Sequence, residues 1–268
     1  DGLRYTFKKF SGCFDHLVYR GLDRLAAPAS LNIWRAPTDN DRNIRETWER
    51  AGLNLVQPRV YETSCEEADG LVVLKCSMAL LPVYRQKVVS MECTYTIGAD
   101  GSIDSSMHVV KDMDMPELPR FGFVLPLPKA MQQTEYLGYG PEESYVDKRR
   151  ASWFGRFTTN ADENYEDYIK PQENGSHFGT REVEVMDQMG EGLKVVSAKP
   201  FSFNVSRYTV KELTEKMHDY ELEEAPFTLL HLDYAMAGIG SNSCGPRLLE
   251  QYRFNEPEFD FHLRITMF

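Results

Sequence analysis

Polar side chains crowd together where an apolar run of the chain ends. The segment NIWRAPTDND (32–41) closes with two carboxylates, Asp39 and Asp41. If this segment were extended, both carboxylates would lie on one face, as paired acid–base groups require. The structural alternative is a turn stabilised by Asx-type hydrogen bonds and by a salt bridge to Arg35 or Arg42. We favour the structural interpretation for Asp39.

The other residue types that bind metals or attack substrates show no useful spacing. The five cysteines are odd in number and form no CxxC pair, and the six histidines form no HxH or HExxH motif. The sequence therefore predicts neither a disulfide framework nor a zinc site.

Composition and charge narrow the class of protein. The 268 residues include 42% hydrophobic and 26% charged side chains, as in ordinary globular proteins. The net charge of −11 would repel nucleic acid, and we interpret the adjacent cations Lys148, Arg149 and Arg150 as a solvated turn. The sequence contains no run of 18 apolar residues, so it predicts no membrane-spanning helix. The sequence starts directly with strand-like alternation, which suggests a piece of a longer chain and leaves a cytoplasmic or periplasmic location open.

Alternation with a period of two predicts that strands dominate. Apolar residues alternate with polar ones at 91–97 and again at 103–109, and GADG between them predicts a hairpin turn. Segments 201–205 and 259–267 repeat the pattern. Each strand has one polar face, as antiparallel sheets allow.

Helices are expected in two short segments. Residues 44–51 carry apolar side chains at helical spacing and end at Gly52, and residues 209–217 begin with the capping-box spacing of Thr209 and Glu212. The proline-rich segment 111–130 could separate two halves, but we prefer a strand crossover within one large sandwich.

Four polar stretches interrupt the alternation, and loops of this kind commonly carry function. We call them the first (32–41), second (138–150), third (168–182) and fourth (238–246) stretch. Their distinctive pieces are RAPTDND in the first, GYGPEE with Tyr145 and Asp147 in the second, PQENG in the third, and GIG leading to CGP in the fourth; FNVSRY at 203–208 accompanies them.

In this order and spacing, the pieces resemble the C-terminal small-chain domain (domain 5) of glycoside hydrolase family two β-galactosidases, over nearly the whole chain. The resemblance implies an all-β fold with few helices, a large antiparallel supersandwich like that of galactose mutarotase, formed by residues 1–268. It also implies a parent that hydrolyses terminal β-D-galactosides with retention, using two glutamates on a separate α/β barrel. We expect no catalytic or metal-binding residue in this chain and no activity when it is isolated; any Mg or Na would bind the parent's barrel.

Glu142 and Glu143 form the most tempting carboxylate pair in this chain. Retaining glycosidases hold two carboxylates about 5 Å apart, whereas neighbouring residues of a strand point to opposite faces. In a loop the pair could converge. We expect instead that one glutamate braces its loop and that the other is solvated.

The resemblance also implies that the first and fourth stretches border the parent's active site. Arg35, Asp39 and Asn40 would hold the base of a closing loop, and Arg42, Asn43, Ile44 and Arg45 would form its rim. In the fourth stretch Cys244 stands where the family's tryptophan stacks on sugar, and cysteine has no stacking plane. Cys244 is either part of that subsite or a small buried side chain in a tight turn. Candidate sugar-contact residues in the second and third stretches are Tyr139, Glu142, Glu143, Tyr145, Glu173 and Asn174.

Two other functions compete with an accessory role. A mutarotase-like enzyme would use His177 or His231 with Glu173 as acid and base. A free-standing carbohydrate-binding module would use an aromatic platform such as Tyr139, Tyr145 and Trp153. The partners that we expect are the parent's barrel, a galactoside or other carbohydrate, and further copies of the parent in a homo-oligomer; we expect neither nucleic acid nor membrane.

Overall fold

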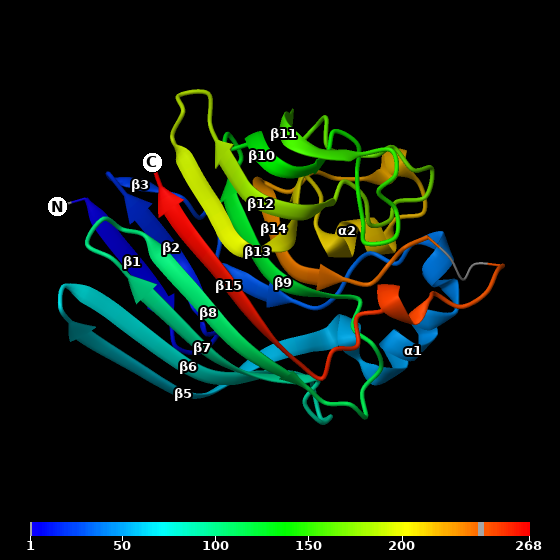
Figure 1. Cartoon of the computed structure of the whole chain (residues 1–268), viewed down its shortest axis with the longest axis horizontal. Coiled ribbons are helices and arrows are strands. Elements are labelled where there is room, and N and C mark those ends of the chain that lie inside the picture. The colour runs from blue at the N-terminus through cyan, green and yellow to red at the C-terminus, as the bar shows by residue number, and fades with distance from the viewer. Residues whose placement is uncertain (1, 241–243) are drawn as a thin grey trace.

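Strands dominate the computed structural model, which describes residues 2–240 and 244–268 (Figure 1). The strands are β1 (Leu3–Lys8), β2 (Cys13–Tyr19), β3 (Leu22–Asp23), β4 (Ser30–Asn32), β5 (Val56–Ala68), β6 (Leu71–Pro82), β7 (Val89–Ile97), β8 (Ile103–Lys111), β9 (Arg120–Pro128), β10 (Gln133–Gly140), β11 (Trp153–Asn160), β12 (His177–Met186), β13 (Gly192–Ser206), β14 (Phe227–Met236) and β15 (Glu258–Met267). The helices are α1 (Ile44–Ala51) and α2 (Val210–Glu215), with the 3₁₀ turns η1 (Asp39–Arg42), η2 (Leu53–Leu55), η3 (Asp219–Glu221) and η4 (Glu250–Tyr252).

One large antiparallel sheet contains 12 of these strands, and β1–β2–β3 form a smaller sheet. The main path of the large sheet runs β11-β10-β12-β13-β15-β8-β7-β6-β5, and β14 leaves it at β13 to pair with β9, which pairs with β4. The predicted all-β, antiparallel class is confirmed.

The large sheet folds back on itself around an aromatic core. Phe121 on β9 packs edge-on against Phe259 on β15, with ring centres 5.1 Å apart, although these strands do not pair. The small sheet closes another side, where Phe14 meets Tyr95 at 5.4 Å and the Tyr95 hydroxyl donates to the carbonyl of Gly12. These contacts across strands bury the apolar face that the alternation predicted.

The predicted hairpin and the crossover segment both belong to this sheet. β7 and β8 pair with Ile97 opposite Ile103, and Gly101 closes the turn with φ +82°, a backbone conformation that favours glycine. β9 lies inside the proline-rich segment and pairs with β14 and β4, so residues 120–128 of that segment form a strand of the sheet.

The helix predicted at 44–51 is confirmed, but the one predicted at 209–217 is shorter. α2 begins after the cap at Thr209, whose hydroxyl accepts from the Glu212 N–H, and it ends at Glu215. The N–H groups of Met217 and the next residue donate instead to the Glu221 carboxylate at 3.0 and 3.1 Å. That side-chain acceptor replaces the carbonyls that a longer helix would supply, and Met217 remains exposed.

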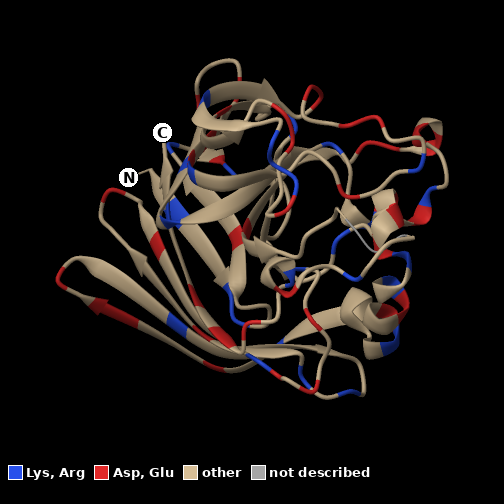
Figure 2. Ribbon diagram, turned by 45° about the vertical axis from the view of Figure 1, so that its right-hand side comes forward, with Lys and Arg blue, Asp and Glu red and all other residues tan. Residues whose placement is uncertain are grey.

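All four stretches gather at the end of the sheet that is remote from the two termini (Figure 1). α1 and the segment after β14 lie there together. Acidic segments outnumber basic ones across the fold, in keeping with the net charge (Figure 2). No helix among the described residues is long and apolar enough to cross a membrane.

The end of α1 gives a test of packing against the sheet. Gly52 has φ +78° and a Cβ there would lie 2.9 Å from the Cβ of Pro82, whereas Gly190 has the same φ with open space around it. We expect Gly190→Ala to lower the free energy of unfolding by about 1 kcal/mol, from backbone strain alone. Gly52→Ala should lower it by about 3 kcal/mol, because overpacking is added. Denaturant unfolding measures both losses, and equal losses would contradict the packing described.

Candidate functional site

A buried arginine of the first stretch organises the site. The Arg35 guanidinium is 1% exposed and forms two hydrogen bonds with the Asp41 carboxylate, at 3.0 and 2.6 Å. Its remaining N–H groups donate to the carbonyls of Ala237 and Gly238, the latter at 3.1 Å, and its plane lies over the Trp48 ring of α1. A planar donor of this kind suits one carboxylate and two carbonyls at once.

The first stretch is built around Asp41 and not around Asp39. Asp41 also accepts from the Thr38 N–H at 2.9 Å, which fixes the start of η1. The side chain of Asp39 is exposed, and Asp39 contributes its backbone N–H to Gln172 Oε1 at 3.0 Å. The structural role that we assigned to the Asp39 side chain is therefore wrong. The 3₁₀ turn directs the side chain of Asp41 toward Arg35 instead.

The other predicted base and rim residues lie at or near the surface, and Asn40, Ile44 and Arg45 are half-buried. The Asn40 amide donates to the carbonyl of Ile239 at 2.6 Å, which ties the first stretch to the fourth. Arg42 and Asn43 are exposed, and α1 starts directly after them. A surface hollow of about 510 Å³ adjoins this rim. Its lining consists of Asn43, Ile44, Thr47, Pro116, Glu117 and Arg247.

The second and third stretches meet at a single carboxylate. Glu143 is buried and accepts hydrogen bonds from four donors: the Lys148 ammonium, the Tyr168 hydroxyl at 2.6 Å, the Tyr145 hydroxyl at 3.1 Å and the Gly175 N–H at 2.9 Å. Glu142 beside it is exposed. The expectation that one glutamate braces the loop while the other is solvated is confirmed.

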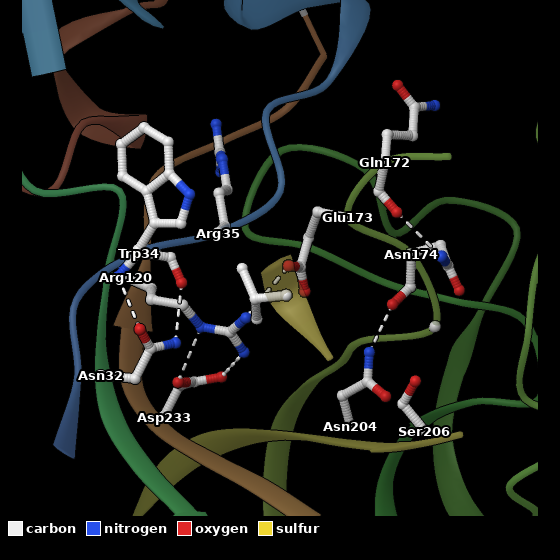
Figure 3. Close-up of polar contacts among 12 residues, drawn as sticks. Asn32, Trp34, Arg35, Arg120, Gln172, Glu173, Asn174, Asn204, Ser206 and Asp233 are labelled. Atoms are coloured by element: carbon white, nitrogen blue, oxygen red, sulfur yellow. Dashed lines mark hydrogen bonds and ion pairs between the residues drawn. The ribbon is translucent and has the colours of Figure 1, made fainter. Parts of the chain in front are cut away.

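A second buried arginine binds two carboxylates (Figure 3). Arg120 holds Asp233 through both nitrogens of one edge and Glu173 at 3.0 Å, and all three side chains are at most 3% exposed. Burial raises the pKa of Glu173 and of Asp233, and the Arg120 charge opposes that rise. The Glu173 N–H donates to the Ala36 carbonyl at 3.0 Å, so this cluster also supports the first stretch.

The cluster around Arg120 was missed at the level of sequence. Arg120 and Asp233 are 113 positions apart, and each lies in a strand whose neighbours are apolar. A signal was present in LLHLDY (229–234), where two polar residues share the face opposite Leu230 and Leu232. Polar side chains on a strand whose two faces are both buried need hydrogen-bond partners inside the protein.

Several candidate sugar-contact residues lie in the interior. Tyr145, Glu143, Glu173 and Asn174 are all less than 9% exposed and are bound to the loops around them; the Asn174 amide donates to Gln172. Their side chains hold the stretches in place and do not face solvent. Tyr139 is half-buried between Phe154 and Phe178.

The residues named for the two competing functions do not come together as those functions require. His177 is bound to Asn164 at 2.7 Å and to the Tyr139 carbonyl, and burial lowers its pKa to about 4. Burial and the Arg120 charge lower the pKa of His231. The hydrogen bonds of the described residues join Glu173 to neither ring. The aromatic platform of a carbohydrate-binding module is not formed by these residues either. Trp153 is 59% exposed, but Tyr145 is 2% exposed and cannot present its ring to a sugar on the surface.

Cys244 is exposed, so its interpretation as a buried turn residue is wrong. Within the fourth stretch, positions 241–243 lie outside the described residues. No group of His, Cys, Asp and Glu side chains in the part of the chain that the structure describes could hold a metal ion.

The chain matches the family described as beta galactosidase small chain over residues 1–265. It is 43% identical to a β-galactosidase of Actinobacillus pleuropneumoniae over 95% of its own length, and 38% identical to one of Staphylococcus xylosus over 98%. It spans about a quarter of each relative, 25% and 26%. The chain, an all-β sheet with four polar stretches at one end, therefore belongs to the β-galactosidase small-chain family.

Solved structures with similar folds are much more distant in sequence. They include an aldose epimerase homologue from C. elegans, with a TM-score of 0.48 and 8% identity over 100% of this chain and 96% of that one. A putative aldose 1-epimerase from Escherichia coli has a TM-score of 0.46 and 10% identity over 99% and 98%. These similarities are too weak to carry an argument about chemistry.

The Arg35–Asp41 pair gives a test of what holds the site. Asp41→Asn leaves the buried guanidinium without its counter-charge, and we expect a loss of about 3 kcal/mol in the free energy of unfolding. Glu46→Gln is the matched control, because its pair with Arg50 has a similar length of 2.7 Å but is 68% and 78% exposed. That change should cost at most about 0.5 kcal/mol. Similar losses in the two variants, measured by chemical denaturation, would argue against Arg35 as the organiser.

Proposed function

We propose that this chain is the small-chain region of a larger β-galactosidase, where it borders the substrate pocket without supplying the catalytic groups. Family membership and the names of the relatives support this parentage, and the relatives are about four times as long. The observation that carries the accessory role is the use of the buried carboxylates in and around the four stretches: each binds a structural partner.

The acid and base of a retaining glycosidase must be able to exchange protons with substrate or water. Asp41 is paired with Arg35, Glu173 with Arg120, and the Glu143 carboxylate already has four donors. Removing any of them from its partner would leave a buried charge unpaired. These pairings support a parent in which the two catalytic glutamates lie on its α/β barrel, together with any Mg or Na that it binds.

The pocket-edge role follows from a fixed base beneath an exposed rim. Arg35 and Asn40 anchor the base, whereas Arg42 and Asn43 face outward beside the hollow of about 510 Å³. Exposed polar groups can bind water in one state and protein or sugar in another, as a closing loop requires. The partners that we propose for this edge are the barrel and a galactoside, and we propose that the parent assembles with further copies of itself.

The isolated chain should fail to hydrolyse a chromogenic β-galactoside. Turnover should equal that of a heat-inactivated sample, because the acid–base pair lies elsewhere. Glu142→Gln is the informative variant, since Glu142 is the exposed member of its pair. Turnover that this substitution abolishes would place the chemistry in this chain and overturn the proposal.

In the full-length parent, Cys244→Trp should act on the leaving-group side of the pocket. A new indole against a sugar contributes about 1 kcal/mol, which is less than a tenfold gain in affinity. A contact made equally in ground and transition states lowers KM and leaves kcat nearly unchanged. Lactose kinetics and glucose inhibition constants measure the effect. If neither moves while thermal stability falls, the fourth stretch does not line the pocket.

A further inference from the structure

We propose that Asp147 is the positioning residue of the fourth stretch: its carboxylate sets the path of the chain from β14 toward Cys244. This inference rests on the proposed pocket-edge role and names the contact that maintains it. Asp147 belongs to the second stretch, 92 positions from its partner in the fourth.

One carboxylate binds two successive backbone donors. Asp147 Oδ1 accepts from the Ile239 N–H at 3.0 Å, and Oδ2 accepts from the Gly240 N–H at 2.8 Å. Hydrogen bonds to an ionised acceptor are stronger and shorter than neutral ones. This arrangement fixes both the position and the direction of the backbone as it leaves the sheet.

The two glycines of the fourth stretch explain how the carboxylate comes so close. A Cβ on Gly238 would lie 2.6 Å from Cγ and Oδ2 of Asp147, and one on Gly240 would lie 3.0 Å from Oδ2. Real Cβ atoms essentially never approach another atom as closely as 2.6 Å, and a Cβ contact of 3.0 Å is uncommon. The close contact of Asp147 with this segment therefore depends on the two glycines of GIG. The Ile239 side chain between them packs against Tyr145 and Met236.

The carbonyls of the same segment are held from the first stretch. Arg35 binds those of Ala237 and Gly238, and Asn40 binds that of Ile239. The N–H groups of Ala237 and Gly238 donate to backbone carbonyls at 2.9 and 2.8 Å. Asp147 thus supplies the last two acceptors for the donors of 237–240, immediately before the chain departs toward Cys244.

Loss of the carboxylate should move the fourth stretch without unfolding the protein. In Asp147→Asn the side chain keeps its shape, but its NH₂ faces one of the two N–H groups. A displaced pocket edge weakens ground-state and transition-state binding together, so KM rises while kcat stays nearly constant.

The experiment uses the full-length parent and reads two quantities. In Asp147→Asn we expect hydrogen exchange at the amides of Ile239 and Gly240 to accelerate about tenfold or more, and KM for lactose to rise about tenfold with kcat nearly unchanged. Asp187→Asn is the matched control. Asp187 also binds two backbone N–H groups, those of Met189 and Glu191, in a turn outside the four stretches. Both of those N–H groups donate to Oδ1 of Asp187, which an asparagine oxygen can replace. Asp187→Asn therefore removes the same charge but should accelerate exchange in that turn much less, and it should leave KM unchanged.

A double-mutant cycle tests the link between Asp147 and Gly238. Gly238→Ala alone should accelerate exchange at Ile239 and Gly240 as Asp147→Asn does, because the new methyl displaces the carboxylate. Once Asp147→Ala has removed that carboxylate, adding Gly238→Ala should change the exchange rates little. Full additivity of the two changes would show that the carboxylate does not require the glycine.

The outcomes separate this inference from the proposed function. Unchanged exchange at both amides in Asp147→Asn overturns the positioning role, whatever the kinetics show. Accelerated exchange with an unchanged KM supports the backbone contact and overturns the pocket-edge function. A KM that rises equally in Asp187→Asn would reduce the effect to general stability and would also overturn the positioning role.

Discussion

The two-point ion pair between Arg35 and Asp41 is the constraint on which the functional end of the molecule depends. It is buried, so it persists only because each partner has further hydrogen bonds: Asp41 takes the Thr38 N–H, and Arg35 takes two carbonyls beyond β14. These hydrogen bonds explain why so many polar groups follow the apolar run at the start of the first stretch. They satisfy backbone groups of a distant segment where the sheet can no longer do so.

Buried charge is distributed among several such centres at the same end of the sheet. Arg120 carries two carboxylates, and Glu143 takes two hydroxyls, an ammonium and a backbone N–H. Each centre joins segments that are far apart in the sequence, so hydrogen bonds link the described parts of the polar stretches to one another on a β scaffold. A base that is held by several such contacts is what an accurately placed rim requires.

Local patterns in the sequence predicted the parts of the fold that depend on neighbouring residues. Alternation predicted the hairpin of β7 and β8, and helical spacing with Gly52 predicted α1. Contacts set by tertiary structure could not be predicted in this way. The choice of Asp41 over Asp39 depends on where Arg35 points, and the early end of α2 depends on the carboxylate of Glu221.

The candidate site was predictable only as a set of loops, because their chemistry depends on pairings across the chain. Sequence could indicate that one glutamate of Glu142 and Glu143 is a brace, but the assembly around Arg120 needs the fold. The most direct test of the account is a crystal structure of the full-length parent with a galactoside bound. We predict that residues 42–45 and Cys244 border the sugar pocket while Arg35 and Asp41 stay paired beneath them. If these segments face solvent away from the bound sugar, the account is contradicted.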